Sequence, residues 1–493
     1  MPSMMPARIT GLLVVGLATS VLSVAHADVG DYTSLQTKYN TSFPKKADRP
    51  ITAADQKLIP LSIKSNPAGY VDGFDPKKYN EWQQVTLDPS TGAKCGDGSP
   101  FSFWVNRRAS TSNLMVFLEG GGACWDFQSC SSTMASGPAL ANVLKASADK
   151  DTGAVIATTG LAAGDKSLMI PLYSALLKDS ASNLDNKVQG WNKIFVPYCT
   201  GDVHVGLSTR VYTDPTGAKP PITIYHNGVI NSLQTAAWVR NNLQAPKQLM
   251  LTGQSAGGVG AVGLYHALRL LFPVQQGYML NDAGPSFFAD QNGTDAANPS
   301  APLHRTALPI WGLSEKRLLA DGTTRSLLDW YQTQLTGLDV KNFGTLNQAV
   351  ARRWPKDRFS MTATQEDYVF GTYSYRRFYP DTQGTDRAVR IANTVARWKI
   401  DIDRFAVNMQ STPNYGFYLP ATRSWLYGHT MFSDVGRTAD IQEQGLDMNA
   451  YMKNFTDPTL PLMKAKEQDF SADRQQVSVT GQGSILLLNS IGF

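Results

Sequence analysis

The stretch LTGQSAGGVGAVGLYHALRLLF, residues 251–272, constrains this chain more than any other part of its sequence. Ser255 lies between Gly253 and Gly257, where an apolar run typical of a strand becomes a run typical of a helix. A strand that turns directly into a helix needs glycines at the turn, because side chains there would obstruct it. The pattern therefore predicts a strand, a sharp turn that presents the serine, and a helix. The alternative is a structural serine in a tight turn.

Short apolar runs typical of buried strands recur on both sides of this turn. They are FSFWV, NLMVFLE, KIFVPYC, QLMLTG, QGYMLN, RFSMTAT and NYGFYL, and the last of them is expected to be the final strand. Segments of helical length separate several of these runs, including a long predicted helix over residues 385–409. Strands that alternate with helices predict an α/β fold with a mostly parallel sheet and helices on both faces.

The N-terminal segment predicts the cellular location. Arg8 is followed by the apolar run GLLVVGLATSVLSV and the small-residue exit AHA, which is typical of a secretory signal peptide over residues 1–27. An uncleaved anchor is the alternative. No later run reaches the roughly 20 apolar residues of a membrane helix. We therefore expect a secreted or periplasmic protein without an integral membrane segment.

The remaining residues, 28–493, are expected to form a single domain. Residues from about 28 to 90 are rich in Asp, Pro, Lys and Thr, and we expect a surface arm there. Residues from about 285 to 350 begin with a stretch dense in Pro, Asn and Ala, and we expect a lid-like insertion.

Charge and cysteine content exclude some classes of protein. The net charge of +5 comes from basic residues spread among acidic ones, so no nucleic-acid partner is expected.

Four cysteines in an exported chain favour disulfides over metal binding. Cys124 and Cys130 are close enough to close one loop, and Cys95 would then pair with Cys199 by elimination. Free thiols are the alternative.

A nucleophilic serine needs a histidine base that a carboxylate orients. Four of the six histidines can be excluded. His26 lies in the signal peptide, and His266 is too far along the helix that follows Ser255. His204 and His226 precede the serine, which does not fit the order Ser, acid, His along the chain. His429 follows the last predicted strand and has Gly428 beside it, so it is the preferred base. His304, in the proline-rich segment, is expected to be a surface histidine, and His204 a loop histidine near the site.

The acid is expected in a loop between Ser255 and His429. Asp367 is preferred because it follows the strand-like RFSMTAT and opens the aromatic run DYVFGTYSYRRF. Asp282 is the first alternative and Glu366 the second, and Asp367 could instead be a simple helix N-cap.

The run LEGGGACW directly after a predicted strand offers backbone N–H groups for an oxyanion. The residue after the nucleophile, Ala256, would add another. A phosphate-binding loop is the alternative reading, but this run lacks the Lys and Ser/Thr of a P-loop.

Taken together, FLEGGGACW, VPYCTGDVHVG, GQSAGG, LNDAG and GHT resemble the pectin acetylesterase and Notum family of secreted carboxylesterases. The likeness extends over roughly residues 95 to 430. It implies an α/β-hydrolase-like fold and a Cys124–Cys130 bridge. It also implies a Ser-His-Asp site, whose residues are Ser255 as nucleophile, His429 as base, Asp367 as acid, and the N–H groups of Gly121, Gly122 and Ala256 as oxyanion hole.

The sequence therefore predicts an esterase that hydrolyses short acyl esters through an acyl-enzyme. The resemblance implies O-acetyl groups on a pectin-like polysaccharide as substrate. An extracellular polyester or another short-chain ester is the alternative substrate, and an inactive carbohydrate-binding surface protein is the alternative class. No cofactor is expected, and no metal, because no His/Cys/Asp cluster has ligand spacing.

Overall fold

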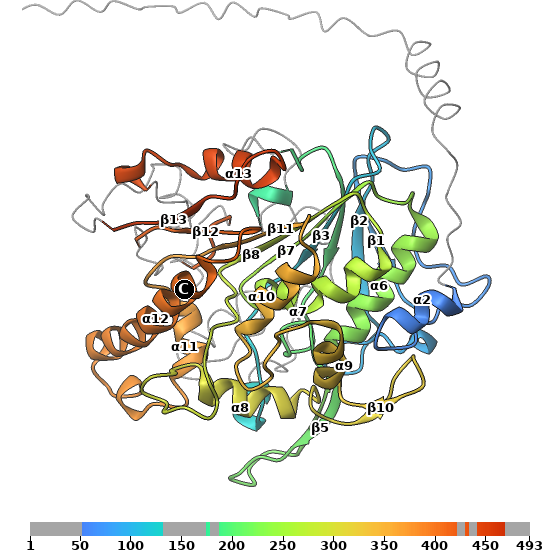
Figure 1. The fold of residues 1–493 in the computed structure, drawn as a ribbon. Helices are drawn as coiled ribbons and strands as arrows, with labels where there is room; N and C mark the ends of the chain where they lie inside the picture. The colour runs from blue at the N-terminus through green and yellow to red at the C-terminus, as the bar shows by residue number, and fades with distance from the viewer. Residues whose placement is uncertain (1–51, 132–173, 178–186, 422–428, 433–440, 469–493) are drawn as a thin grey trace, which may run out of the picture. The chain divides into compact units, whose positions relative to one another are not determined.

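The computed structural model describes residues 52–131, 174–177, 187–421, 429–432 and 441–468. Within these residues a nine-stranded sheet has the order β1-β2-β4-β3-β7-β8-β11-β12-β13 (Figure 1). From β4 to β13 every neighbouring pair is parallel, whereas β2 pairs antiparallel with both β1 and β4. The strands are β1 Trp82–Thr86, β2 Ser102–Asn106, β3 Leu114–Leu118, β4 Asn192–Val196, β7 Gln248–Gln254, β8 Gln276–Asp282, β11 Arg358–Thr362, β12 Tyr415–Leu419 and β13 Lys464–Lys466.

Helices cover both faces of this sheet. Those described are α2 Ala53–Leu58, α3 Phe127–Ser131, α6 Gly228–Asn242, α7 Ala256–Leu271, α8 Ala301–Ile310, α9 Leu327–Gln334, α10 Thr345–Arg353, α11 Tyr368–Tyr375, α12 Arg387–Met409 and α13 Met448–Thr456. Figure 1 shows α7, α10 and α12 on one side of the sheet and α13 on the other. Two short ribbons lie outside the sheet, β5 Ser208–Tyr212 with β6 Ile222–His226, and β9 Arg317–Leu318 with β10 Thr324–Arg325.

Strand β3 illustrates why the sheet is covered twice. All five of its residues are buried, and successive side chains point to opposite faces. Leu114, Val116 and Leu118 join the core beneath α6, α7 and α12, whereas Met115 and Phe117 join the core beneath α13. Such continuous apolar strands are typical of parallel sheets buried on both faces. The predicted fold class, a mostly parallel sheet between helices, is confirmed.

The two ends of the sheet differ from the sequence prediction. Strand β1 lies inside the segment expected to be a surface arm, and β13 follows β12, which the sequence indicated as the final strand. Both are edge strands, and both are polar: β1 is WQQVT and β13 is KAK. Because polar residues are commonly used to protect exposed sheet edges, such strands lack the apolar run that identifies a central strand.

Residues 285–350 contain α8, α9, the β9–β10 ribbon and the first two thirds of α10. Ser326 begins α9 with a capping box, in which its side chain accepts the Asp329 N–H and the Asp329 side chain accepts the Ser326 N–H. Leu327 and Trp330 of α9 belong to the main core. The segment therefore packs against the sheet helices. No helix within the described residues is long and apolar enough to cross a membrane.

Candidate active site

Ser255 occupies the turn between β7 and α7 and has a strained backbone, with φ 55° and ψ −122°. Positive φ is uncommon for a residue with a side chain, and such strain clusters at functional sites. A Cβ on Gly257 would overlap the carbonyl oxygen of Leu118, and a Cβ on Gly253 would lie 2.7 Å from that same oxygen. The two glycines of the motif are thus required because the turn lies directly against the end of β3.

Hydrogen bonds hold this turn at both sides. The Ser255 N–H donates to the carbonyl oxygen of Asp282 at the end of β8, at 2.7 Å, and the Gly258 N–H donates to the Ser255 carbonyl at 2.9 Å. The serine is partly exposed and lines the pocket described below. The position combines a fixed backbone with an accessible hydroxyl.

His429 and Asp367 meet although 62 residues separate them. His429 Nδ1 and Asp367 Oδ2 are 2.8 Å apart, and the Asp367 side chain is fully buried whereas that of His429 is 17 % exposed. Asp367 Oδ1 also accepts the Phe370 N–H at 2.9 Å and caps α11. The N-cap and the histidine partner, which the sequence presented as alternatives, are therefore two functions of one carboxylate.

The environment of His429 raises its pKa above the ordinary histidine value. Burial lowers the pKa, but the negative charge of Asp367 and its hydrogen bond, together with the charge of Asp282, outweigh that effect. His429 has no direct hydrogen bond with Ser255 within the described residues. In active sites of this kind such bonds are often long and tighten only when substrate is bound.

The other two candidate acids have different surroundings. Glu366 is partly exposed beside Asp367. Asp282 is buried, and its carboxylate accepts the N–H groups of Met431 and Phe432, at 2.6 and 3.0 Å. Among the three candidate acids, the structure brings Asp367 to the imidazole.

Two of the other histidines are structural. His204 is buried, its Nε2 lies 2.8 Å from the carbonyl oxygen of Glu119, and burial lowers its pKa to about 4. His226 lies 2.7 Å from the Tyr212 hydroxyl and 2.9 Å from the Thr200 carbonyl oxygen.

His304 corrects a sequence prediction. It was expected at the surface, but it lies on α8 and lines the pocket beside Phe343, with ring centroids 6.2 Å apart. Burial lowers its pKa to about 4. The proline-rich composition that suggested an exposed loop instead begins a helix, with Pro302 in its first turn, where the absent N–H costs nothing.

The glycine loop follows β3 and faces the nucleophile turn. A Cβ on Gly120 would lie 2.7 Å from the Gln254 carbonyl oxygen and 3.2 Å from the Ser255 Cβ. Gly121 and Gly122 have φ of 151° and 77°, values that only glycine adopts readily. Within the described residues, the N–H groups of Gly121, Gly122 and Ala256 donate to no other protein atom. These three donors are available to an oxyanion.

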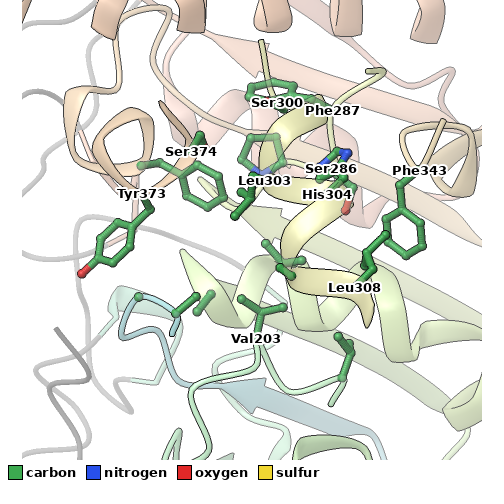
Figure 2. A pocket seen from close by; sticks show the side chains of 18 of the residues that line it. Val203, Ser286, Phe287, Ser300, Leu303, His304, Leu308, Phe343, Tyr373 and Ser374 are labelled. Carbon is green, nitrogen blue, oxygen red and sulfur yellow. The ribbon is translucent and has the colours of Figure 1, made fainter. Parts of the chain in front are cut away.

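A pocket of about 770 Å³, including its part open to solvent, extends from Ser255. Its wall comes from the glycine loop, α7, α8 and α11, and Figure 2 shows Tyr373 and His304 on opposite sides of it. Most lining side chains are apolar: they include Trp125, Val203, Val205, Val259, Phe287, Leu303, Leu308, Trp311, Phe343 and Phe370. Sequence reasoning missed this pocket, since its lining is dispersed along the chain.

All four cysteines form disulfides. Cys124 pairs with Cys130, and Cys95 pairs with Cys199. The carbonyl oxygen of Cys124 accepts the Trp311 indole N–H at 2.8 Å, which ties the glycine loop to the residue after α8.

One group of metal-ligand side chains occurs within the described residues, and it consists of Cys124, Cys130 and His226. Because both cysteines form a disulfide, neither offers a thiolate, and the group does not fit a metal ion.

On a mostly parallel sheet, the described residues thus include a serine on a strand-to-helix turn, a histidine bonded to a buried aspartate, and a glycine loop whose N–H groups have no acceptor among these residues. This combination of fold and site defines an α/β hydrolase. A family model described as pectinacetylesterase matches residues 76–151 and 165–317, which include the glycine loop and Ser255. The resemblance seen in the sequence is thus confirmed: over these residues the chain is similar to the pectin acetylesterase and Notum family.

Individual relatives match shorter regions. Mouse palmitoleoyl-protein carboxylesterase NOTUM is 24 % identical over 188 residues, which are 38 % of this chain and 31 % of that protein. Pectin acetylesterase 4 of Arabidopsis thaliana is 22 % identical over 173 residues, 35 % of each chain. The match therefore spans about a third of the length of these curated relatives. A solved structure, the Wnt deacylase Notum from Drosophila, aligns over 80 % of this chain and all of its own, with 16 % identity and a TM-score of 0.49.

Proposed function

We propose that this chain is a serine carboxylesterase with Ser255 as nucleophile, His429 as base and Asp367 as acid. The observation that carries the proposal is the 2.8 Å contact between His429 Nδ1 and Asp367 Oδ2. This contact leaves Nε2, the other ring nitrogen, for the serine. The relatives named as carboxylesterases and pectin acetylesterases support the same reaction class.

In the proposed reaction, Ser255 Oγ bonds to the ester carbonyl carbon while its proton passes to His429 Nε2. The N–H groups of Gly121, Gly122 and Ala256 bind the oxyanion, and each such donor is worth about 2.7–4 kcal/mol of barrier. The tetrahedral intermediate collapses, the C–O bond to the alcohol breaks, and His429 returns the proton to the departing oxygen. Water then attacks the acyl-enzyme by the same route and releases the acid.

Two acyl groups have support from different observations. Similarity to pectin acetylesterases favours an acetyl group on a pectin-like polysaccharide. The apolar pocket next to Ser255 favours a longer acyl chain, as in an aliphatic polyester or another extracellular ester, because an acetyl group would bury little of that surface. We give acetyl esters as the first substrate class and longer apolar acyl esters as the second.

The proposed location is outside the cytoplasm. The signal-peptide pattern of residues 1–27 and the two disulfides both favour an oxidising compartment. Residues 1–27 lie outside the described residues.

The first experiment compares wild type with Ser255→Ala. The wild type should hydrolyse p-nitrophenyl acetate and react covalently with a fluorophosphonate probe, and the variant should do neither. A folded wild type that fails to react with the probe would instead support the alternative class, a carbohydrate-binding protein on a hydrolase scaffold. EDTA should leave turnover unchanged, and loss of turnover would contradict the metal-free mechanism.

The second experiment separates the two acyl classes. Val259 lines the pocket and is partly buried, so Val259→Phe should narrow it. Rates on p-nitrophenyl acetate, butyrate and octanoate, and on acetylated pectin, acetylated xylan and an aliphatic polyester, should be measured for this variant. The control is Val211→Phe on β5, whose side chain is 65 % exposed. A selective loss on the longer esters places the acyl chain in the pocket, whereas an equal loss on all esters excludes it.

A further inference from the structure

Asp282 is a buried carboxylate at the C-terminal end of β8, and the reaction scheme above gives it no role. It is 2 % exposed and accepts three hydrogen bonds through its side chain. The Met431 N–H donates to Oδ1 at 2.6 Å, the Phe432 N–H to Oδ2 at 3.0 Å, and the Thr362 hydroxyl to Oδ1 at 3.1 Å. Its backbone carbonyl oxygen accepts the Ser255 N–H at 2.7 Å.

These bonds join three segments that carry the candidate site. Met431 and Phe432 follow His429 after the single residue Thr430, which has a positive φ of 60°. Thr362 is the last residue of β11, and the loop after it leads to Asp367. Asp282 therefore contacts the strand end before the acid, the turn after the base, and the backbone of the nucleophile itself.

Burial raises the pKa of Asp282 to about 6, so above that pH the carboxylate is charged. Its bonds to Met431 and Phe432 are then charge-assisted, which makes each stronger than a bond between neutral groups. They also satisfy two backbone donors that would otherwise be buried without partners, at a cost of about 1–3 kcal/mol each. The turn at His429 is sharp and short. A single carboxylate with two oxygens can hold both consecutive N–H groups, which one amide side chain cannot do.

We propose that Asp282 is a positioning residue, which fixes the turn carrying His429 against the strand end carrying Ser255. This inference rests on the proposed function. In it, Asp282 fixes the separation between the base His429 and the nucleophile Ser255, although it contacts the reacting atom of neither. Its charge also supports the protonated imidazole that forms as Ser255 attacks. Within the described residues, the charged groups that raise the pKa of His429 are Asp367, at the start of α11, and Asp282, on β8.

The test is Asp282→Asn, which keeps the size of the side chain. An amide has one acceptor oxygen, so either Met431 or Phe432 loses its partner and the turn relaxes. Because a displacement of about 1 Å can cost about 100-fold in rate, kcat on p-nitrophenyl acetate should fall about 10- to 100-fold with KM unchanged. The acid limb of the kcat/KM profile should also move to lower pH, since the imidazole loses a neighbouring negative charge.

The matched control is Asp357→Asn. Asp357 is 1 % exposed and bonds the other end of β8 through the Gly277 N–H, at 3.0 Å, as well as Arg269 Nε and the Tyr265 hydroxyl. It should lower the melting temperature but leave kcat per folded molecule and the pH profile unchanged. The folded fraction is counted by active-site titration with the fluorophosphonate probe. If Asp282→Asn behaves in these assays as Asp357→Asn does, Asp282 is only structural and the proposal is overturned.

A milder variant keeps the test decisive if Asp282→Asn does not fold. Thr362→Val removes one hydroxyl donor to the Asp282 carboxylate with little change of shape, and should lower kcat severalfold at constant KM. An unchanged kcat would overturn the proposal. The proposed function fails by a different result, namely a folded wild type whose esterase activity survives Ser255→Ala.

Discussion

Replacement of Asp367 by asparagine probes the acid more sharply than any other change, because the structure determines where the amide atoms lie. Asp367 Oδ1 accepts the Phe370 N–H at 2.9 Å, so in Asp367→Asn the amide oxygen should stay on that N–H. The NH₂ group then replaces Oδ2, which lies 2.8 Å from His429 Nδ1. Because two N–H donors cannot form a hydrogen bond with each other, His429 Nδ1 must become an acceptor. The ring proton must then lie on Nε2.

A histidine with its proton on Nε2 cannot accept the proton of Ser255. We therefore expect kcat to fall by up to about 10⁴, the loss seen when a triad histidine is held in the wrong tautomer, which is about 5.4 kcal/mol of barrier. The helix cap on α11 is retained, so the protein should fold normally. The remaining activity should have its acid limb at lower pH than wild type, because the charge that raises the pKa of His429 is gone.

The assay is steady-state hydrolysis of p-nitrophenyl acetate from pH 5 to 9, with circular dichroism and thermal melting as the test of folding. The wild-type acid limb should lie above the ordinary histidine pKa of about 6.5. Asp386→Asn is the matched control, since Asp386 caps α12 in the same way, with its Oδ1 accepting the Ala388 N–H at 2.8 Å. A folded Asp367→Asn protein with kcat within tenfold of wild type and an unmoved acid limb would refute the reasoning.

Three further predictions concern the turn, the disulfides and the triad as a unit. Gly257→Ala should destabilise the protein and abolish turnover, because its Cβ meets the backbone carbonyl at the end of β3; a normal melting temperature would contradict this. Removal of the Cys95–Cys199 disulfide, with a sequence separation of 104, should lower the free energy of unfolding by about 4.8 kcal/mol in the chain-entropy model. Removal of Cys124–Cys130, with a separation of 6, should lower it by about 2.4 kcal/mol. Equal losses of unfolding free energy, measured by urea denaturation, would rule that model out. The double variant Ser255→Ala with His429→Ala should be scarcely slower than either single variant in kcat, whereas losses that multiply would show independent roles.

Much of the central sheet could be predicted from the sequence because its strands are continuous apolar runs. The turn at Ser255 and the glycine loop could also be predicted from the sequence, because glycine is required where two backbone segments approach closely. The edge strands β1 and β13 were missed because polar edges carry no apolar run. The base and acid could be narrowed by chain order alone, and the contact between Asp367 and His429 depends on packing of distant segments. Their catalytic roles remain predictions.

The pocket and the role of Asp282 were not predictable for a related reason. His304 lies in a segment whose composition suggested a loop, and only its position on α8 turns it toward the pocket. Asp282 was visible in LNDAG as a carboxylate at a strand end. Nothing local showed that its oxygens would bind the N–H groups of Met431 and Phe432, since 149 and 150 residues separate the partners.

The double use of Asp367 has a consequence for redesign of this protein. The same helix that Asp367 caps, α11, contributes Phe370, Tyr373 and Ser374 to the pocket wall. A substitution that shifts α11 to admit a bulkier acyl group would also shift the carboxylate that contacts His429, so we expect selectivity and turnover to change together. Helix α8 forms the facing wall through Leu303 and Leu308 and contributes neither Ser255, His429 nor Asp367. Libraries that aim to change acyl selectivity at constant turnover should therefore vary α8 and leave α11 intact.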